Sequence, residues 1–386
     1  MSKVYKLTIE NKDIFSTVNS FFQKLLEEKI IDNLLLPQES LNSKSVMQTL
    51  VKSPQELGNA NPFAPLLLVN SATLVSQLTI DNPQSKLGAV MRSCEIRAAI
   101  ELAKLKQINL ERLVIIGVDC PGIYESTAYQ KIIEKYKDSQ SLTRDYLSKS
   151  LKNQLQSLEG QEIRLACKGC EYPNPENFSI ALNFFGCDVD KEIFIQFADN
   201  FPQIDPEKLN LLSCEDNGQW RKAIDECRDR RTKTREEIFK QVFENIKDIK
   251  SFLKEFEHCR RCYNCRKECP ICYCRECIFD SLTFEHASEQ YFGWARKKGK
   301  IRMPSDTLLF HITRMNHMAI SCVGCGQCSS ACPNGIPIAK FFKTIGFKVQ
   351  ELFDYKPGRN PDEEIPQSTF KEDEFPEVGL GPKSKA

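Results

Sequence analysis

The sequence lacks any apolar run long enough to cross a membrane. Its best candidates, residues 65–69 and 113–118, have the length of single strands, whereas a spanning helix needs about 20 apolar residues. It also lacks an excess of charge, because 53 Lys and Arg stand against 52 Asp and Glu. Such a balance provides no basic field of the kind that holds DNA or RNA. We therefore expect no nucleic-acid partner and no direct membrane insertion.

Two patterns of cofactor binding are also missing. No G-x-G-x-x-G loop is present, so a Rossmann-type dinucleotide site has no support. The four histidines, His258, His286, His311 and His317, show no paired spacing typical of metal ligands. His258 adjoins Cys259, where it either bonds a neighbouring metal centre or lies on the surface at a helix end.

Cysteine, by contrast, is abundant, with 18 copies in 386 residues. In a small secreted chain this content would suggest disulfides. Here the cysteines cluster at metal-ligand spacings in a long chain that shows no signal peptide. We therefore expect reduced thiols and a cytoplasmic location, and the length suits two or three domains.

One cysteine pattern, Cys-x2-Cys-x2-Cys-x3-Cys-Pro, occurs twice in the C-terminal third. This spacing is typical of bacterial-type ferredoxins with two 4Fe-4S clusters, in which the fourth cysteine of each run ligates the other cluster. The crossed pattern predicts a first ferredoxin site of Cys259, Cys262, Cys265 and Cys332, and a second ferredoxin site of Cys322, Cys325, Cys328 and Cys269.

Structural zinc is the alternative for these cysteines, because four thiolates also suit zinc. Zinc sites, however, usually come as two separated Cys-x2-Cys halves. Two identical four-cysteine runs, each ending in proline (Pro270 and Pro333), favour iron–sulfur clusters. The chain is therefore predicted to move electrons.

The centre of the chain predicts an ordinary α/β fold. Residues 87–91 and 113–118 are short apolar strands, and residues 94–107 repeat apolar side chains at helical spacing. This β-α-β unit should have parallel strands and a right-handed crossover. We also expect helices within 125–160 and strands at 162–166 and 178–185.

The predicted fold class is α/β (α+β), with a central domain around a parallel β-α-β core and a C-terminal bacterial-type dicluster ferredoxin-like domain. The rise in Pro, Glu and Lys beyond Tyr355 indicates a tail without a packed core. The expected division is an N-terminal mixed segment at 1–60 with a helix in 14–31, a central domain at 61–218, a charged helical connector at 219–257, a dicluster domain at 258–353 and a disordered tail at 354–386.

Four more cysteines fall near the ends of the predicted strands: Cys94, Cys120, Cys167 and Cys170. Ligands of open parallel sheets bind beyond the carboxyl ends of the strands, so these loops should converge. The Cys-x2-Cys pair is the strongest part of this pattern, since one turn can grip one metal centre. Each cysteine alone could equally be a small core residue. Together they favour a third 4Fe-4S cluster, at what we call the central site.

Three motifs, followed by the double ferredoxin signature, carry a family resemblance. They are Arg92-Ser-Cys-Glu-Ile-Arg-Ala98, Ile116-Gly-Val-Asp-Cys120 and Cys167-Lys-Gly-Cys-Glu-Tyr-Pro173. In this order they resemble the coenzyme F420 hydrogenase/dehydrogenase β-subunit family, and within it most of all the β (FAD/iron–sulfur) subunits of cytoplasmic formate dehydrogenases. The resemblance covers roughly residues 60–345.

This resemblance implies several properties of the chain. The central domain would bind FAD and a proximal 4Fe-4S cluster held by the four central cysteines, and the flavin would exchange hydride with the deazaflavin coenzyme F420. The implied partner is a molybdenum or tungsten formate dehydrogenase catalytic subunit, or a hydrogenase. A heterodisulfide-reductase-like subunit is a possible second contact. The sequence departs from the hydrogenase branch at Glu95, at Glu171-Tyr172-Pro173 and at 178–182, which leaves deazaflavin, nicotinamide and ferredoxin open as carriers.

The candidate flavin contacts are Asn70, Ser71, Arg92 and Arg97. Arginine can pair with a diphosphate through two hydrogen bonds, and Asn or Ser can bond the ring edge. The alternative is that both arginines form salt bridges with Glu95 or Glu101.

Two hypotheses for the whole chain follow. It is either an oxidoreductase subunit in which a flavin splits hydride electrons between clusters, or a non-catalytic adaptor that wires two complexes together. The cysteines of the loop after the first ferredoxin run either bind an additional metal or form a metal-free loop; they are Cys272, Cys274 and Cys277.

Overall fold

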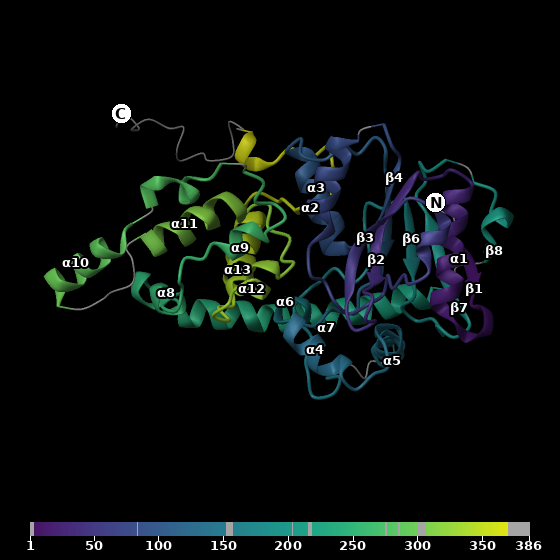
Figure 1. Cartoon of the computed structure of the whole chain (residues 1–386), viewed down its shortest axis with the longest axis horizontal. Coiled ribbons are helices and arrows are strands. Elements are labelled where there is room, and N and C mark those ends of the chain that lie inside the picture. Colours follow the sequence, from purple (N-terminus) through teal and green to yellow (C-terminus); the bar gives the residue numbers. More distant parts are fainter. Residues whose placement is uncertain are drawn as a thin grey trace, which may run out of the picture.

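The computed structural model contains one large sheet and, beside it, a lobe of short helices (Figure 1). The structure describes residues 4–82, 84–151, 157–202, 204–214, 218–274, 276–284, 286–299 and 306–369. Among these residues no helix is both long and apolar enough to cross a membrane.

The sheet has eight strands in the order β3-β2-β4-β5-β6-β7-β1-β8. Its centre is parallel, from β2 through β4 and β5 to β6, and its outer pairs are antiparallel. The strands are β1 (Val4–Thr8), β2 (Asn33–Glu39), β3 (Val46–Val51), β4 (Leu87–Arg92), β5 (Leu113–Val118), β6 (Ile180–Asn183), β7 (Glu192–Phe197) and β8 (Leu212–Ser213).

The expected β-α-β unit is confirmed. β4 pairs in parallel with β5, from Leu87 opposite Leu113 to Arg92 opposite Val118, and α3 (Ser93–Lys104) connects them. The strand expected at 178–185 is also present as β6, parallel to β5.

Helices cover both faces of the sheet. Successive side chains of a strand point to opposite faces, so the apolar residues of one strand belong to two different cores. Ile116 and Val118 of β5 join the core with α1 (Ile14–Glu27), α4 (Ser126–Ile133) and α5 (Ser139–Leu151). Leu113 and Ile115 join the other core, which contains α2 (Ser71–Asp81), α3 and the helical lobe. A sheet buried on both faces explains why β5 is apolar throughout and β4 is free of charged and polar residues up to its last residue, Arg92.

The strand expected at 162–166 is wrong. The peptide N–H groups of Cys167 and Lys168 donate to the Arg164 carbonyl at 2.9 and 3.0 Å, and this closes the short helix α6 (Leu165–Lys168). The Arg164 side chain points inward, where it donates to Gln327 at 2.6 Å and to the Leu67 carbonyl at 2.9 Å. Polar and apolar residues alternate at 162–165, but Arg164 is buried and the segment does not form a strand.

The first 60 residues are not a separate segment. β1 lies between β7 and β8, and β2 pairs with β4, so both are strands of the central sheet. The helix expected in 14–31 is α1, which begins after Asp13 and ends at Glu27. The Asp13 carboxylate accepts from the peptide N–H of Phe15 at 3.2 Å, as a helix N-cap does.

The expected helical connector consists of α7 (Gln219–Asn245) and α8 (Ile249–Glu255). Figure 1 shows α7 running from the sheet to the helical lobe, above α4 and α5 in this view. The lobe contains α9 (Asn264–Lys267), α10 (Ser288–Lys298), α11 (Asp306–Met318), α12 (Gln327–Ser330) and α13 (Ile338–Leu352).

The tail expected to be disordered from 354 onward is in part packed against the central domain. Tyr355 is buried against Ile320 and Ile365, and the peptide N–H of Gly358 donates to Glu101 of α3 at 2.8 Å. The low apolar content of this segment is offset by hydrogen bonds to buried charged groups, which composition does not reveal. Residues 370–386 lie outside the described part of the chain.

Candidate metal centres

The first ferredoxin site forms where the two cysteine runs meet. Cys259, Cys262 and Cys265 line a small cavity together with Cys332, which follows α12 in the second run. The structure thus brings together the four cysteines that the crossed pattern predicts. Cys262 is exposed and Cys265 is buried, so one side of this site faces solvent.

The second ferredoxin site has the reciprocal composition. Cys322, Cys325 and Cys328 line a cavity with Cys269, the last cysteine of the first run. Gly324 and Gly326, with φ of +69° and +85°, bend the backbone between these cysteines. A Cβ at Gly326 would lie 2.8 Å from Ala166 of α6, so this glycine also permits close contact with the central domain.

Arg314 of α11 lies between the two ferredoxin sites. It is 3% exposed and donates from Nη1 to the Cys265 sulfur at 3.2 Å and from Nη2 to the Cys265 carbonyl at 3.0 Å. Burial lowers the pKa of Arg314, but the thiols of Cys265, Cys269 and Cys328 outweigh burial and raise it. A fixed positive charge therefore faces cysteines of both sites.

His311, one turn before Arg314, faces the first ferredoxin site. Its Nε2 lies 3.3 Å from the Cys259 sulfur. Burial, followed by the charge of Arg314, lowers the pKa of His311 to about 3. The ring is therefore neutral near pH 7, and from Nε2–H it can donate to a thiolate. His258 is instead exposed and lies 3.6 Å from Glu257.

The central site unites residues from three places in the central domain. Cys94 lies in the first turn of α3, Cys120 follows β5, Cys167 lies in α6 and Cys170 follows it. Burial and the thiols of Cys120 and Cys170 raise the pKa of Cys167 to about 12, partly opposed by Arg164. The peptide N–H of Cys120 donates to the Pro173 carbonyl at 2.7 Å and joins two of these loops. The predicted third group is thus brought together.

Two buried arginines compensate negative charge at the central site. Arg231 of α7 donates to the carbonyls of Cys120, at 3.3 Å, and Pro121. Burial raises the pKa of Cys120, whereas the charges of Arg92 and Arg231 lower it. These cations favour the thiolate form that metal binding requires.

A single metal ion and a 4Fe-4S cluster require different separations between their four cysteines. Four thiolates on one zinc lie about 4 Å apart, because each Zn–S bond is about 2.3 Å. In the ranges that the structure describes, no three Cys, His, Asp or Glu side chains are placed to hold one metal ion. A 4Fe-4S cluster is wider, since each thiolate ligates a different iron. The cysteine groups offer four free thiols each, which is the donor set that a 4Fe-4S cluster requires.

Three of the candidate flavin contacts lie together around Glu95. Asn70 accepts from the peptide N–H of Ala72 as the cap of α2, and the Ser71 N–H donates to Glu95 at 2.9 Å. Arg92 donates to the Ala64 carbonyl at 2.5 Å and lies 3.6 Å from Glu95. All are buried. The salt bridge weighed as the alternative for Arg92 is thus present.

One buried polar atom of this group lacks a hydrogen-bond partner within the described part of the chain. Asn70 Nδ2 is buried and has no acceptor among the described residues, so Asn70 fits a cofactor contact. Arg97 does not, because its guanidinium is occupied by the carbonyls of Pro357 and Val323.

A cavity of about 390 Å³ lies between the central domain and the ferredoxin lobe, within the size range of small-molecule sites. Cys332 lines it, and so do Ala166 of α6 and the cations Arg235, Lys340 and Lys343. Glu171 partly neutralises them, at 2.8 Å from Lys343 and 3.3 Å from Arg235.

The extra cysteines of the loop after the first run differ in their surroundings. The Cys272 N–H donates to the Cys269 carbonyl at 3.1 Å, and Cys274 is exposed. Burial, with the Cys269 thiol, raises the pKa of Cys272 to about 12. Cys272 thus adjoins the second ferredoxin site.

Comparison with known proteins agrees with the two ferredoxin sites. Residues 255–336 match the family of 4Fe-4S dicluster domains. The chain is 27% identical over 362 residues to the F420-dependent formate dehydrogenase subunit beta of Methanocaldococcus jannaschii, covering 88% of this chain and 91% of that protein. The resemblance expected from the motifs is confirmed.

A second relative has the same kind of name. The F420-dependent formate dehydrogenase 1 subunit beta of Methanococcus maripaludis is 27% identical over 386 residues, covering 93% of this chain and 94% of that protein. Among solved structures, a chain of the F420-reducing NiFe hydrogenase complex from Methanosarcina barkeri aligns with a TM-score of 0.45 and 13% identity. That alignment covers 62% of this chain and 92% of the other, and nothing further is concluded from it.

Proposed function

We propose that this chain is the electron-transfer subunit of an oxidoreductase, with three 4Fe-4S clusters. The observation that carries the proposal is that the eight cysteines of the two ferredoxin runs line two cavities in the crossed pattern. The influence of Cys120 and Cys170 on the pKa values of Cys94 and Cys167 supports the third cluster. When bound, such clusters each accept or release one electron at a time. The name of the formate dehydrogenase β subunits, similar along most of their length, supports an oxidoreductase role.

The three sites follow one another through the molecule. Burial and Glu95 raise the pKa of Cys94, and so does the thiol of Cys325; this influence supports a central site beside the second ferredoxin site. Arg314 then faces cysteines of both ferredoxin sites. The exposed Cys262 of the first ferredoxin site is the proposed exit towards a partner.

A two-electron carrier is proposed at the central domain. FAD suits this position, because a flavin exchanges hydride on one side and single electrons on the other. Asn70, whose Nδ2 is buried without an acceptor among the described residues, is its candidate contact. The proposed hydride carrier is coenzyme F420, which the names of both relatives mention.

The partner is proposed to carry the catalytic metal. A molybdenum or tungsten formate dehydrogenase subunit is the first candidate, since both relatives are named as β subunits of formate dehydrogenases. A hydrogenase is the second candidate. A heterodisulfide-reductase-like subunit is a further proposed contact.

The cofactor content of anaerobically purified protein tests the proposal. Three clusters predict about twelve irons per chain, and the oxidoreductase role predicts one FAD in addition. If FAD is bound, stopped-flow mixing with reduced F420, NADH or reduced ferredoxin identifies the carrier by the rate of flavin bleaching. Bound zinc without iron would contradict the proposal.

A non-catalytic adaptor is the second candidate function. The occupation of Arg92 and Arg97 by contacts within the chain favours it, because these arginines were the candidates for a flavin diphosphate. Clusters without any flavin in the purified protein would support the adaptor.

A further inference from the structure

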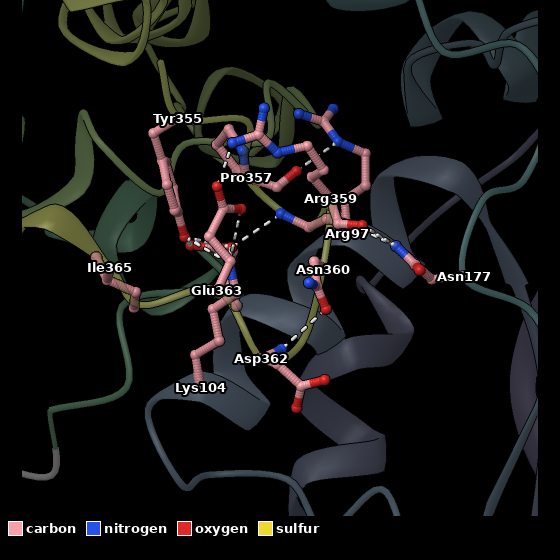
Figure 2. A network of polar contacts seen from close by, with 12 residues as sticks. Arg97, Lys104, Asn177, Tyr355, Pro357, Arg359, Asn360, Asp362, Glu363 and Ile365 are labelled. Atoms are coloured by element: carbon pink, nitrogen blue, oxygen red, sulfur yellow. Dashed lines mark hydrogen bonds and ion pairs between the residues drawn. The ribbon is translucent and has the colours of Figure 1, made fainter. Parts of the chain in front are cut away.

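Residues 354–369, which we call the strap, leave the end of α13 and cross α3 (Figure 2). They meet Glu101, a fully buried carboxylate. The Tyr355 hydroxyl lies 2.7 Å from both Glu101 oxygens, and the Gly358 N–H donates to Glu101 at 2.8 Å. Lys104 lies 3.1 Å from the same carboxylate. A buried charge with these partners is compensated, so the strap is bound to α3 specifically.

The strap touches the helix backbone at one position. Gly358 has φ of +77°, and a Cβ there would lie 2.5 Å from the Cα of Arg97. Only glycine allows both this conformation and this approach. Asn177, from the loop before β6, donates to the carbonyls of Gly358 at 2.7 Å and Arg359 at 2.9 Å.

Arg97, at this contact, has three partners from different segments. Its Nε donates to the Pro357 carbonyl of the strap at 2.9 Å. Its Nη1 donates to the Val323 carbonyl at 3.2 Å, and its guanidinium lies 3.7 Å above the ring of Tyr172. The side chain of Arg97 is 5% exposed, so it makes these contacts in the interior of the molecule.

These partners belong to the loops that carry the cysteines. Val323 lies between Cys322 and Cys325 of the second ferredoxin site, and Tyr172 follows Cys170 of the central site. Arg97 itself stands one turn after Cys94 on α3. One guanidinium thus connects both sites and the strap.

We propose that Arg97, held by the strap, fixes the separation between the central site and the second ferredoxin site. This makes Arg97 a positioning residue for electron passage between them, and the inference rests on the proposed function. Each passage moves one electron, forms and breaks no bond, and uses the electrons that the proposed two-electron carrier supplies. Electron transfer slows steeply with distance, so a fixed separation matters.

An Arg97→Gln variant tests this role in the full chain, purified anaerobically. Arg144→Gln is the matched control, because Arg144 is an exposed arginine of α5 that contacts Asp13. Electron paramagnetic resonance of the dithionite-reduced proteins measures the magnetic interaction between neighbouring reduced centres. We expect unchanged iron content, a weaker interaction and several-fold slower reduction of the ferredoxin sites in Arg97→Gln, with wild-type behaviour in Arg144→Gln.

The outcomes separate this inference from the proposed function. Wild-type protein without three clusters would contradict the proposed function. Three clusters in the wild type, with wild-type line shapes and rates in Arg97→Gln, would overturn only the role of Arg97. If Arg97→Gln loses iron, Tyr355→Phe decides, since it removes only the hydroxyl that faces Glu101. In Tyr355→Phe we expect the magnetic interaction to weaken less than in Arg97→Gln. An interaction as strong as in the wild type would overturn the inference.

Discussion

At the scale of single residues, two side chains of α11 add to the cysteines what the motifs do not contain. Arg314 and His311 are buried and face cysteine sulfur at 3.2 and 3.3 Å. Hydrogen bonds to the sulfurs and nearby charge are among the factors that set cluster potentials. No spacing rule distinguishes these two residues from other polar residues of a helix, so sequence reasoning missed them.

Replacing Arg314 with Gln is expected to lower the reduction potential of both ferredoxin sites. Loss of a buried positive charge disfavours the reduced, more negative form. A charge-assisted hydrogen bond contributes about 1.5–3 kcal/mol, so the expected shift is on the order of 60 mV or more for a one-electron couple. Redox titration followed by electron paramagnetic resonance measures it. The reduction potentials of the Arg144→Gln variant should equal those of the wild type. Unchanged potentials in Arg314→Gln would show that the charge of Arg314 is screened from the ferredoxin sites.

Replacing Cys167 with Ser is expected to remove the central cluster alone. The ferredoxin sites use cysteines of 259–332 only, so iron should fall by about four of about twelve atoms per chain. Iron analysis and spectroscopy of the reduced protein measure the loss. Cys187→Ser is the control, because Cys187 belongs to none of the three groups. Disappearance of the ferredoxin signals as well would contradict the independence of the sites.

At the scale of elements, α3 combines three tasks that the sequence pattern does not separate. Its apolar residues Ile96, Ala99 and Ile100 pack in the core, its first turn carries Cys94, and its buried polar residues Arg97 and Glu101 bind the strap. The helical period predicted the first task correctly. From the sequence, the charged side chains of Arg97 and Glu101 could equally bind a cofactor or stabilise the fold. Their hydrogen-bond partners show that they bind the strap.

Replacing Gly358 with Ala is expected to detach the strap from α3. A left-handed non-glycine residue costs about 1–2 kcal/mol, and the added Cβ at 2.5 Å from Arg97 Cα adds a clash. Gly160→Ala is the matched control, because Gly160 has φ of +74° and open space around its Cβ. Thermal unfolding should show the lower melting temperature for Gly358→Ala. Equal melting temperatures would mean that the strap does not contribute to stability.

At the scale of the whole molecule, the central domain and the ferredoxin lobe are joined by buried polar contacts. Arg164 donates to Gln327 at 2.6 Å, and Lys343 donates to Glu171 at 2.8 Å. Burial raises the pKa of Glu171, but the charge of Lys343 and its hydrogen bond outweigh it and lower the pKa to about 2. Glu171 thus joins the two parts of the molecule, whereas Glu95 accepts from Ser71 inside the central domain.

Removal of the clusters is expected to loosen the ferredoxin lobe more than the sheet. The crossed ligands connect 259–265 to Cys332 and 322–328 to Cys269, and metal binding couples to folding where the ligands hold distant segments together. The sheet keeps its own two-sided core. Hydrogen–deuterium exchange of chelated and intact protein should show faster exchange at 256–353, with β4 and β5 unchanged. If the lobe exchanged equally fast in chelated and intact protein, its helices would fold without clusters.

The sequence by itself determined the cluster type and the parallel core, because both depend on local order along the chain. Cysteine spacing matches the geometry of one cluster, and apolar periodicity matches one strand or helix. Only the tertiary structure decided the use of Arg97, the docking of the strap and the placing of Arg314 between two sites. These depend on contacts between residues up to 260 positions apart, and no local pattern records such partners.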